Sequence, residues 1–299
     1  MKNLIYISFL SIFFTSCESI IEVEIPKGDP KIVVNSYFEP DSTWIVYLSE
    51  NQYILDDGPL KNITNASVTV NGSDGSSIQL THQEDGIYVS SSKPSQNVNY
   101  TITASAPNYT TVTASNTVPQ AVEISKVDTS TIIKNGMPSL QMAINFNDPA
   151  TQSNYYKLSA SAIIKTYTYD PFGNIVDSVE SQTELAFKIN DLIFNEERDV
   201  VKPNWVFTDE FLSGRNYTLV AEFDAGVLGY NPGYSNLKSV TIHFTSMSYD
   251  YYRYLKSIEE YREANGNPFA QPVQIFSNVT NGRGIFAGSS TFSETIYFN

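Results

Sequence analysis

Histidine and cysteine most often carry catalysis or hold a metal, and this chain has few of either. It contains two histidines, His82 and His243, and a single cysteine, Cys17. The absence of HExxH, HxH and a second cysteine argues against the common zinc sites and against an intramolecular disulfide. A GxSxG elbow is also absent. Because the chain has so many serines, any Ser-His-Asp grouping would be better explained by chance proximity than by catalysis. We therefore expect no catalytic residue, no metal site and no cofactor, and predict that the protein is not an enzyme.

Carboxylates are the other chemically useful groups in the chain. They occur in four short runs: Asp56-Asp57, Glu84-Asp85, Glu196–Asp199 and Asp209-Glu210. A glycosidase needs two carboxylates across a cleft, and spacing along the chain does not place such a pair. Neither Asp56-Asp57-Gly58 nor the loop at Asp74 has the spacing of a twelve-residue calcium loop. The runs are typical of solvated loops, and whether calcium binds there stays open.

Composition indicates a β-rich protein with an acidic surface. Aromatic residues make up 13% of the chain, mostly 20 Tyr and 17 Phe, and these types suit the half-buried surface of a pleated sheet. The 32 acidic against 18 basic side chains give a formal charge of −14. Phosphate would repel such a chain, which argues against binding to nucleic acid and against peripheral binding to anionic lipid.

The first 17 residues have the pattern of an export signal. A basic Lys2 precedes the apolar run Leu4–Phe14, which is too short to span a bilayer and fits the core of a signal peptide. The run ends in Thr15-Ser16-Cys17, which resembles the lipobox of bacterial lipoproteins, with Phe14 where many have Leu. This resemblance implies that residues 1–16 are removed as a signal peptide and that Cys17 is acylated.

Residues 17–30 are predicted to be an acylated, acidic tether. Glu18, Glu22 and Glu24 follow the cysteine closely, and Pro26 and Pro30 favour a non-helical spacer. Acids soon after an acylated cysteine resemble the signal that sends Bacteroidota lipoproteins to the outer leaflet of the outer membrane. A solvated tether that happens to be acidic is the alternative.

Residues 31–119 are predicted to form an immunoglobulin-like or fibronectin-like β-sandwich. Seven short segments rich in β-branched and aromatic residues follow one another, each bounded by Gly, Pro, Asn or Asp. Val68 and Val70 alternate with polar residues, and Asn71–Ser76 has the composition of a hairpin loop. Residues 120–299 are predicted to form a second β-rich domain with longer strands.

Two features stand out in this second domain. The segment Tyr169–Asn174 has the Pro and Gly of a hairpin tip, and two long strands could carry Phe172 beyond the sandwich into a contact, although an ordinary long hairpin is at least as good an explanation. A single helix is predicted near 248–264, with Ser248 as its N-cap and Gly266 and Pro268 ending it. Its Tyr251, Leu255 and Ile258 face is expected to pack onto a sheet.

Several segments together resemble a family of Bacteroidota lipoproteins defined only as a domain of unknown function. They are PKIVVNSYF, YLSEN, NASVTVNGSDG, DGIYVSSS, NYTITASAPNYTTVTAS and the C-terminal NPFAQPVQIFSNVTNGRGIFAG. Genes of this family often lie beside genes for TonB-dependent outer-membrane receptors. The resemblance implies a lipid-anchored, surface-exposed outer-membrane protein that is an accessory or partner of such a β-barrel. Asp41-Ser42-Thr43 and Asp177-Ser178-Val179 also resemble the short O-glycosylation motif of exported Bacteroidota proteins, although such tripeptides arise readily by chance.

The residues expected to contact a partner or ligand are aromatic or cationic. They are Trp44, Trp205, Phe172 and Arg283, the last of which lies in a Gly-Arg-Gly turn. An alternative function, a cell-surface glycan-binding module, requires exposed aromatic rings beside polar groups. The two tryptophans are the first candidates for such rings.

Overall fold

The computed structural model describes residues 28–53, 56, 58–134, 136–150, 152–191, 193–194, 200–224, 226, 235–267 and 269–298. Cys17, Glu18, Glu22, Glu24 and Pro268 lie outside these residues, so the predictions made for them are not addressed by the structure. The chain forms two compact units. Of the first, Met1–Asp29 with Tyr53–Asp56, only four residues are described, and the Asp56 N–H donates to the Tyr53 carbonyl there. The second, Pro30–Gln52 with Asp57–Asn299, contains every element described below.

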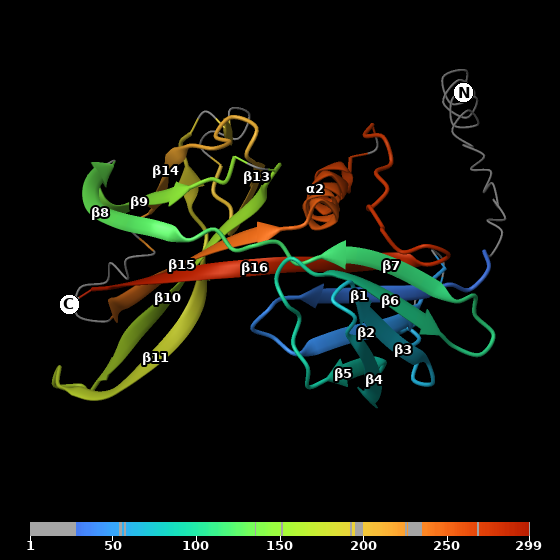
Figure 1. Ribbon diagram of the computed structural model, residues 1–299. Helices are drawn as coiled ribbons and strands as arrows, with labels where there is room; N and C mark the ends of the chain where they lie inside the picture. The colour runs from blue at the N-terminus through green and yellow to red at the C-terminus, as the bar shows by residue number, and fades with distance from the viewer. Residues whose placement is uncertain are drawn as a thin grey trace, which may run out of the picture. The chain divides into compact units, whose positions relative to one another are not determined.

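Strands dominate the second unit (Figure 1), which confirms the prediction of a mainly β protein. The strands are β1 (Ile32–Phe38), β2 (Trp44–Glu50), β3 (Ser67–Gly72), β4 (Ser77–Glu84), β5 (Ile87–Ser90), β6 (Asn99–Ser105), β7 (Val112–Thr117), β8 (Ile124–Lys134), β9 (Met137–Asn147), β10 (Tyr155–Tyr169), β11 (Ile175–Leu185), β12 (Lys188–Ile189), β13 (Asn204–Thr208), β14 (Asn216–Phe223), β15 (Ser235–Met247) and β16 (Arg283–Tyr297). Helix α2 (Tyr249–Ala264) lies between β15 and β16 in the chain. It is too short and too polar to cross a membrane, and no other helix of the described residues does so.

The strands form a large mixed sheet and a small antiparallel sheet. The large sheet runs β11-β10-β15-β16-β1-β2-β5-β4-β3-β6-β7, with β13 paired to β10, and the small one runs β12-β14-β9-β8. Strand β16 lies inside the large sheet and joins the part that contains β15, β10 and β11 to the part that begins with β1. Its first half pairs in parallel with β1, from Val33 opposite Arg283 to Phe38 opposite Gly288, and its second half pairs antiparallel with β15.

Glycine allows β16 to approach its neighbours closely. Gly284 has φ +100°, and a Cβ there would lie 2.0 Å from the Val34 carbonyl oxygen. A Cβ on Gly288 would lie 2.4 Å from the Thr117 carbonyl oxygen. A larger residue at either position would force the strands apart, so these glycines are required by the packing around β16.

Two separate hydrophobic cores stabilise the fold. The first uses strands from β1 to β7 and also Phe286 of β16, and its centre is a cluster of rings in which Trp44 lies 4.8 Å from Phe38 and 4.9 Å from Tyr100. The second lies between β10, β13 and β15 on one side and β9 and β14 on the other. The core residues change from one cluster to the other between Val118 and Val122, and β16 then returns the chain to the first core.

Helix α2 begins as predicted. The Ser248 side chain accepts a hydrogen bond from the Tyr251 N–H at 3.3 Å, and Asp250 lies in the first turn, where it complements the helix dipole. The expected packing of Leu255 and Ile258 onto a sheet is realised only in part, because both are half-buried and Ser257 is the one buried residue of the helix. Tyrosine rings make much of the contact instead, with Tyr251 5.3 Å from Tyr37 of β1.

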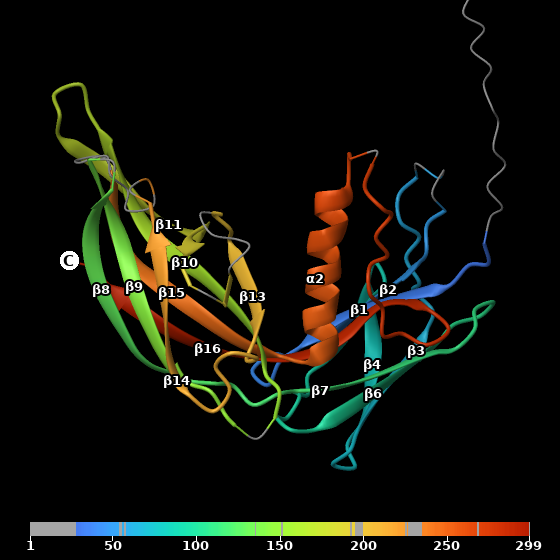
Figure 2. The ribbon, with the colours of Figure 1, turned by 90° about the horizontal axis from the view of Figure 1, so that it is seen from above.

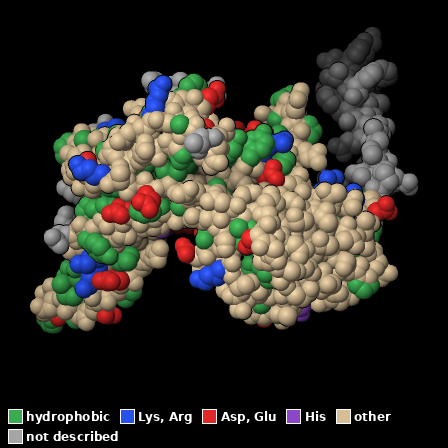
Figure 3. Space-filling view, viewed as in Figure 1, with side chains coloured by type: hydrophobic (Ala, Val, Ile, Leu, Met, Phe, Trp, Pro, Cys, Tyr) green, Lys and Arg blue, Asp and Glu red, His purple; other side chains and the backbone are tan. Residues whose placement is uncertain are grey.

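The β10–β11 hairpin is the longest in the described part of the chain, and its tip lies where it was predicted. Gly173 has φ +85°, and the Asp170 carboxylate accepts from the N–H groups of Phe172 and Asn174. The far part of the hairpin diverges from the sheet formed by β8, β9 and β14 (Figures 1 and 2). Hydrophobic side chains are visible along this projection in Figure 3. The hairpin therefore carries its tip away from the second core.

Candidate functional site

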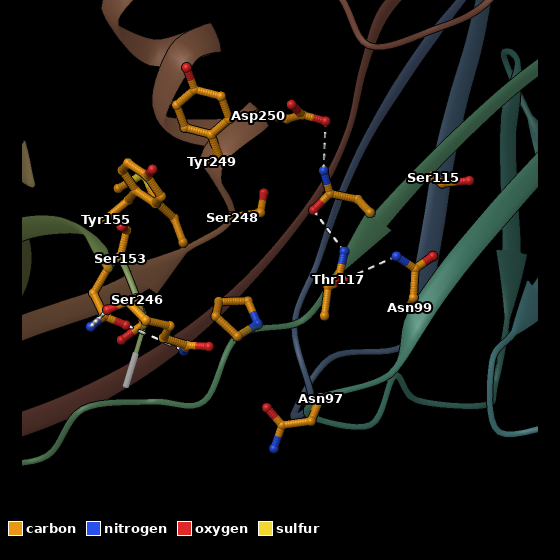
Figure 4. A pocket seen from close by; sticks show the side chains of 15 residues that line it. Asn97, Asn99, Ser115, Thr117, Ser153, Tyr155, Ser246, Ser248, Tyr249 and Asp250 are labelled. Atoms are coloured by element: carbon orange, nitrogen blue, oxygen red, sulfur yellow. Dashed lines mark hydrogen bonds between the residues drawn. The ribbon is translucent and has the colours of Figure 1, made fainter. Parts of the chain in front are cut away.

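A polar cleft of about 470 Å³ lies beside the N-terminus of α2 (Figure 4). Three parts of the chain form it: the strands β6 and β7 with their flanking residues, the segment that leads into β10, and the junction of β15 with α2. Its lining residues are Asn97, Asn99, Ser115, Asn116, Thr117, Pro119, Gln152, Ser153, Asn154, Tyr155, Ser246, Met247, Ser248, Tyr249 and Asp250. Amides and hydroxyls predominate, so the cleft is built for hydrogen bonding.

Asp250 fixes one wall of the cleft. Its carboxylate accepts from the side-chain amides of Asn116 at 3.1 Å and Asn278 at 3.0 Å. The oxygen of the Asn116 amide in turn accepts from the backbone N–H groups of Thr117 and Gly288. The network ties α2 to β7 and β16, so this wall is already ordered before any ligand arrives.

A second network holds the segment that leads into β10. The Asn154 amide donates to the Asp209 carboxylate at 3.2 Å and to the Pro149 carbonyl at 3.1 Å. Asp148 is buried below this segment and accepts from the Tyr156 hydroxyl at 2.5 Å and the Gly214 N–H at 2.9 Å. Burial raises the pKa of Asp148 even though these donors oppose the shift. The network therefore anchors the loop, and its carboxylates do not line the cleft.

Two tyrosines give the cleft an aromatic edge. The rings of Tyr155 and Tyr249 lie 5.1 Å apart, and Tyr249 is 52% exposed. Burial raises the pKa of the Tyr155 phenol above its usual value, so its hydroxyl stays protonated at neutral pH. These rings offer apolar surface beside a row of amides.

The chemistry available in this cleft is recognition of a neutral, polar ligand. Asp250 is the one ionisable carboxylate among its described lining residues, and its oxygen is already engaged by two amides. The described lining contains no imidazole, ammonium or guanidinium group. An amide can donate and accept at once, which matches the hydroxyl groups of a sugar better than it matches an anion.

His243 forms a separate polar cluster on the large sheet. Its Nε2 lies 3.1 Å from the Ser161 hydroxyl and its Nδ1 lies 2.9 Å from the Ser293 hydroxyl. Burial, with a smaller effect from the Lys157 ammonium, lowers the pKa of the imidazole. In a catalytic triad a carboxylate orients the imidazole, whereas here the orienting position is taken by a hydroxyl. We interpret the cluster as a cross-strand contact between β10, β15 and β16.

The predicted role of the tryptophans requires correction. Trp44 is fully buried among Phe38, Tyr100 and Phe286, and Trp205 is 1% exposed. The Trp205 indole donates to the Phe187 carbonyl at 3.0 Å. Burial of these large rings stabilises the two cores, which leaves neither ring available to stack on a sugar or a partner.

Phe172 and Arg283 are exposed, as a contact residue must be. Phe172 is 88% exposed at the tip of the β10–β11 hairpin. Arg283, at the start of β16, lines another cleft of about 560 Å³ together with Arg253 and Lys256 of α2. The Arg253 guanidinium lies 4.3 Å from the centre of the Phe276 ring. The four predicted contact residues are therefore distributed between two cores, a hairpin tip and a helix-lined cleft.

Sequence reasoning did not identify the polar cleft. Its amides come from positions 97–99, 116 and 152–154, which only the folded chain brings together. A usable signal was the density of amides in the short segments Gln96–Asn99 and Gln152–Asn154. Among the described residues, no group of three or more His, Cys, Asp or Glu is placed to hold a metal ion. His82, the other imidazole, lies against the Tyr88 ring at 5.3 Å.

A protein-family model matches most of the chain. Residues 18–295 match a protein family described as a domain of unknown function, DUF4249. No curated protein matches the chain.

Proposed function

The chain belongs to the DUF4249 family, and we propose that it is a non-enzymatic outer-membrane lipoprotein, anchored through Cys17, that binds a TonB-dependent receptor or a related outer-membrane β-barrel. The signal-peptide pattern of residues 1–16 and the position of Cys17 support the anchor. Glu18, Glu22 and Glu24 support an outward-facing location. Two or three acyl chains on one residue give stable attachment, which a single chain does not.

The projecting β10–β11 hairpin is the observation that carries the partner claim. Its far part exposes the apolar side chains Phe172 (88%), Ile175 (56%), Val176 (61%) and Val179 (60%). Single exposed apolar residues are ordinary, but several on one projecting element indicate a protein contact. Strand β11 is also the end of the large sheet, where among described residues it pairs only with β10. Its free edge could add a strand from a partner.

Attachment to the membrane makes a modest interface sufficient. Confinement of two proteins to one surface raises their local concentration, so the second contact behaves as an intramolecular one. A hairpin with a few apolar anchors can then hold a barrel without high intrinsic affinity. Burying such anchors contributes about 25 cal/mol per Å² of apolar surface removed from water.

The test is affinity purification of the full-length protein from mildly solubilised membranes. We expect a large β-barrel to accompany the wild type and to be lost from the variant Phe172→Ser, Val176→Ser, Val179→Ser. The matched control is Ile133→Ser, which changes an equally exposed (71%) apolar residue beside the tip of the β8–β9 hairpin. Undiminished recovery of the barrel with the triple variant would exclude the hairpin as the contact, and recovery of no barrel by the wild type would exclude the partner.

A cell-surface glycan-binding module is the second candidate function. The polar cleft favours it, because the exposed Tyr249 ring lies beside amides and hydroxyls in an arrangement suited to sugar hydroxyls. The two functions are compatible, since the cleft and the hairpin tip are formed by different residues. Binding of glycans by the full-length protein, measured by calorimetry, tests this candidate separately from the purification.

We also propose that residues 31–119 form an immunoglobulin-like or fibronectin-like sandwich. Support comes from the first core, to which β1 and β2 contribute on one part of the sheet and β3, β6 and β7 on another. Such a rigid support would hold one wall of the polar cleft at the ends of β6 and β7.

A further inference from the structure

We propose that the polar cleft continues into a neighbouring cleft to form one groove, which we call the amide groove, and that this groove binds an extended, neutral oligosaccharide. The inference rests on the glycan-binding candidate and names the ligand of that site. It does not depend on the barrel contact, which uses the hairpin.

Continuity is given by shared lining residues. The neighbouring cleft has a volume of about 560 Å³ and shares Asn97, Gln152 and Asn154 with the cleft beside α2. Beyond these residues it is lined by Gln120, Ala121, Val122, Glu123, Ser125, Asn147 and Pro149. The three shared amides therefore lie at the junction, where a chain passing from one cleft to the other would contact them.

The lining of the amide groove selects a neutral ligand rich in hydroxyls. Seven of its side chains are primary amides: Asn97, Asn99, Asn116, Gln120, Asn147, Gln152 and Asn154. Asn116 and Asn154 use their amides in the hydrogen-bond networks that order the walls. The remaining amides each pair donors with an acceptor in one plane, which matches adjacent hydroxyls on a sugar ring. The ionisable carboxylates of the described lining are Asp250 in one cleft and Glu123 in the other, and neither cleft has a lining cation. An acidic oligosaccharide would therefore be repelled by these two carboxylates, with no lining cation to offset the repulsion.

One end of the amide groove can also stack a sugar ring. Tyr249 is half-exposed and lies against Tyr155, and both belong to the cleft beside α2. Sugar rings have apolar C–H faces, and a tyrosine combines an apolar face with a polar hydroxyl. We place a terminal or near-terminal sugar at this end, with the rest of the chain directed past Gln152 into the neighbouring cleft.

The groove is also ordered without ligand. The Asp250 network fixes the α2 wall, and the hydrogen bonds of Asn154 to Asp209 and Pro149 fix the segment between the two clefts. Preformed binding sites avoid the entropic cost of ordering loops during binding. Affinity should therefore increase as a sugar chain lengthens and fills the second cleft.

The experiment measures binding of maltose, cellobiose and laminaribiose and of the corresponding hexasaccharides to the full-length protein by titration calorimetry. We expect the hexasaccharide of at least one series to bind at least tenfold more tightly than its disaccharide. The variant Asn97→Gly, Gln152→Ala removes two exposed amides at the junction. Its affinity for that hexasaccharide should fall roughly tenfold, as the loss of two hydrogen bonds implies.

The matched control is Asn108→Gly. Asn97 and Asn108 are both exposed and both have a left-handed backbone, with φ of 60° and 68°. Glycine accepts this conformation, so both substitutions remove an amide without straining the chain. Asn108 lies outside the groove, next to Tyr109 in a different cleft, and its substitution should leave the affinity unchanged.

The outcomes separate this inference from the functions on which it builds. Equal affinities for disaccharide and hexasaccharide would overturn the continuous groove while leaving glycan binding intact. An unchanged affinity of the junction variant would place the glycan site elsewhere. Tighter binding of a hexagalacturonate than of every neutral chain would overturn the choice of a neutral ligand. Binding of none of the neutral chains would overturn both the inference and the glycan-binding candidate, and the barrel purification would be unaffected.

Discussion

The β10–β11 hairpin has a near part, which includes residues 156–162 of β10, and a far part around its tip, residues 172–179. Both parts carry apolar residues, but they place them in opposite environments. In the near part, Tyr156, Leu158, Ala160 and Ala162 point into the second core and are at most 3% exposed. In the far part, Phe172, Ile175, Val176 and Val179 are each more than half exposed. The near part is covered because β9 and β14 contribute to the same core. The far part diverges from those strands, and none of the described strands covers it (Figure 1).

This difference shows that alternation in a strand predicts a face and does not predict what covers that face. Apolar residues occur along β11 where the described part of the fold leaves them exposed, and an exposed apolar surface lowers solubility unless a partner covers it. Substitutions in the covered part should therefore change the stability of the fold. Substitutions in the uncovered part should change only binding.

The largest effect is expected at Trp205, which pairs with Leu158 of the near part. Trp205→Ala should lower the free energy of unfolding by about 3–5 kcal/mol, because it empties a large volume in the core. It also removes one of the two hydrogen bonds that the Phe187 carbonyl accepts, the other coming from the Lys202 N–H. Denaturant unfolding measures this loss, and Trp205→Phe should recover part of it. A fully stable Trp205→Ala variant would show that this part of the hairpin is not covered as described.

Leu255 of α2 is an intermediate case, because its side chain is half-buried. Leu255→Ala should lower the free energy of unfolding by about 1 kcal/mol, below the range of about 2–5 kcal/mol for a fully buried leucine. The measurement is again denaturant unfolding. A loss as large as that of a core leucine would mean that the helix is as well covered as the near part of the hairpin.

A smaller effect on stability is expected in the far part. The variant Phe172→Ser, Val176→Ser, Val179→Ser should change the free energy of unfolding by less than about 0.5 kcal/mol per site, because these side chains are already in water. The same variant should lose the β-barrel in affinity purification. Large destabilisation would instead show that the far part packs against the protein itself.

The smallest effect is a pH dependence of stability. It arises at His243 of β15, which contacts Ser161 on the polar face of the near part. Burial and Lys157 lower the pKa of His243 below its usual value of about 6.5, so the folded chain binds this proton less tightly than the unfolded chain. The stabilising effect is complete above the unfolded pKa and is lost as the pH falls through the folded pKa. The Tm should therefore fall on acidification from about pH 7 to about pH 5. The fall should be smaller in His243→Gln, with His82→Gln as control, and identical slopes would contradict the assignment.

Local features of the fold were predictable from the sequence, and long-range ones were not. Ser248 predicted the start of α2 and Gly173 predicted the tip of the hairpin, because helix caps and turns depend on residues that are neighbours in the sequence. The parallel pairing of β16 with β1 left no local trace. The burial of Trp44 and Trp205 followed from packing that composition alone could not reveal.

The amide groove was unpredictable for the same reason. Asn97, Gln152 and Asp250 lie on three separate segments, and each is ordinary in its own surroundings. Amides in loops are frequent in turns, so their type did not distinguish a binding surface from a connection. Their meeting depends on how β7, β10 and α2 are arranged by the large sheet.

The pairing of β16 with β1 has a consequence for how the chain reaches its folded state. The hydrogen bond between Ser289 and Glu39 joins positions 250 residues apart. Synthesis from the N-terminus makes β1 and β2 available before β16, so Phe38 and Trp44 lack the Phe286 ring until β16 is made. Closing so long a loop is slow, and apolar surface that stays exposed to water in the meantime is prone to aggregation. Delivery of β16 is therefore the step at which folding of the first core can finish, and the interval before it is when the chain most needs a chaperone.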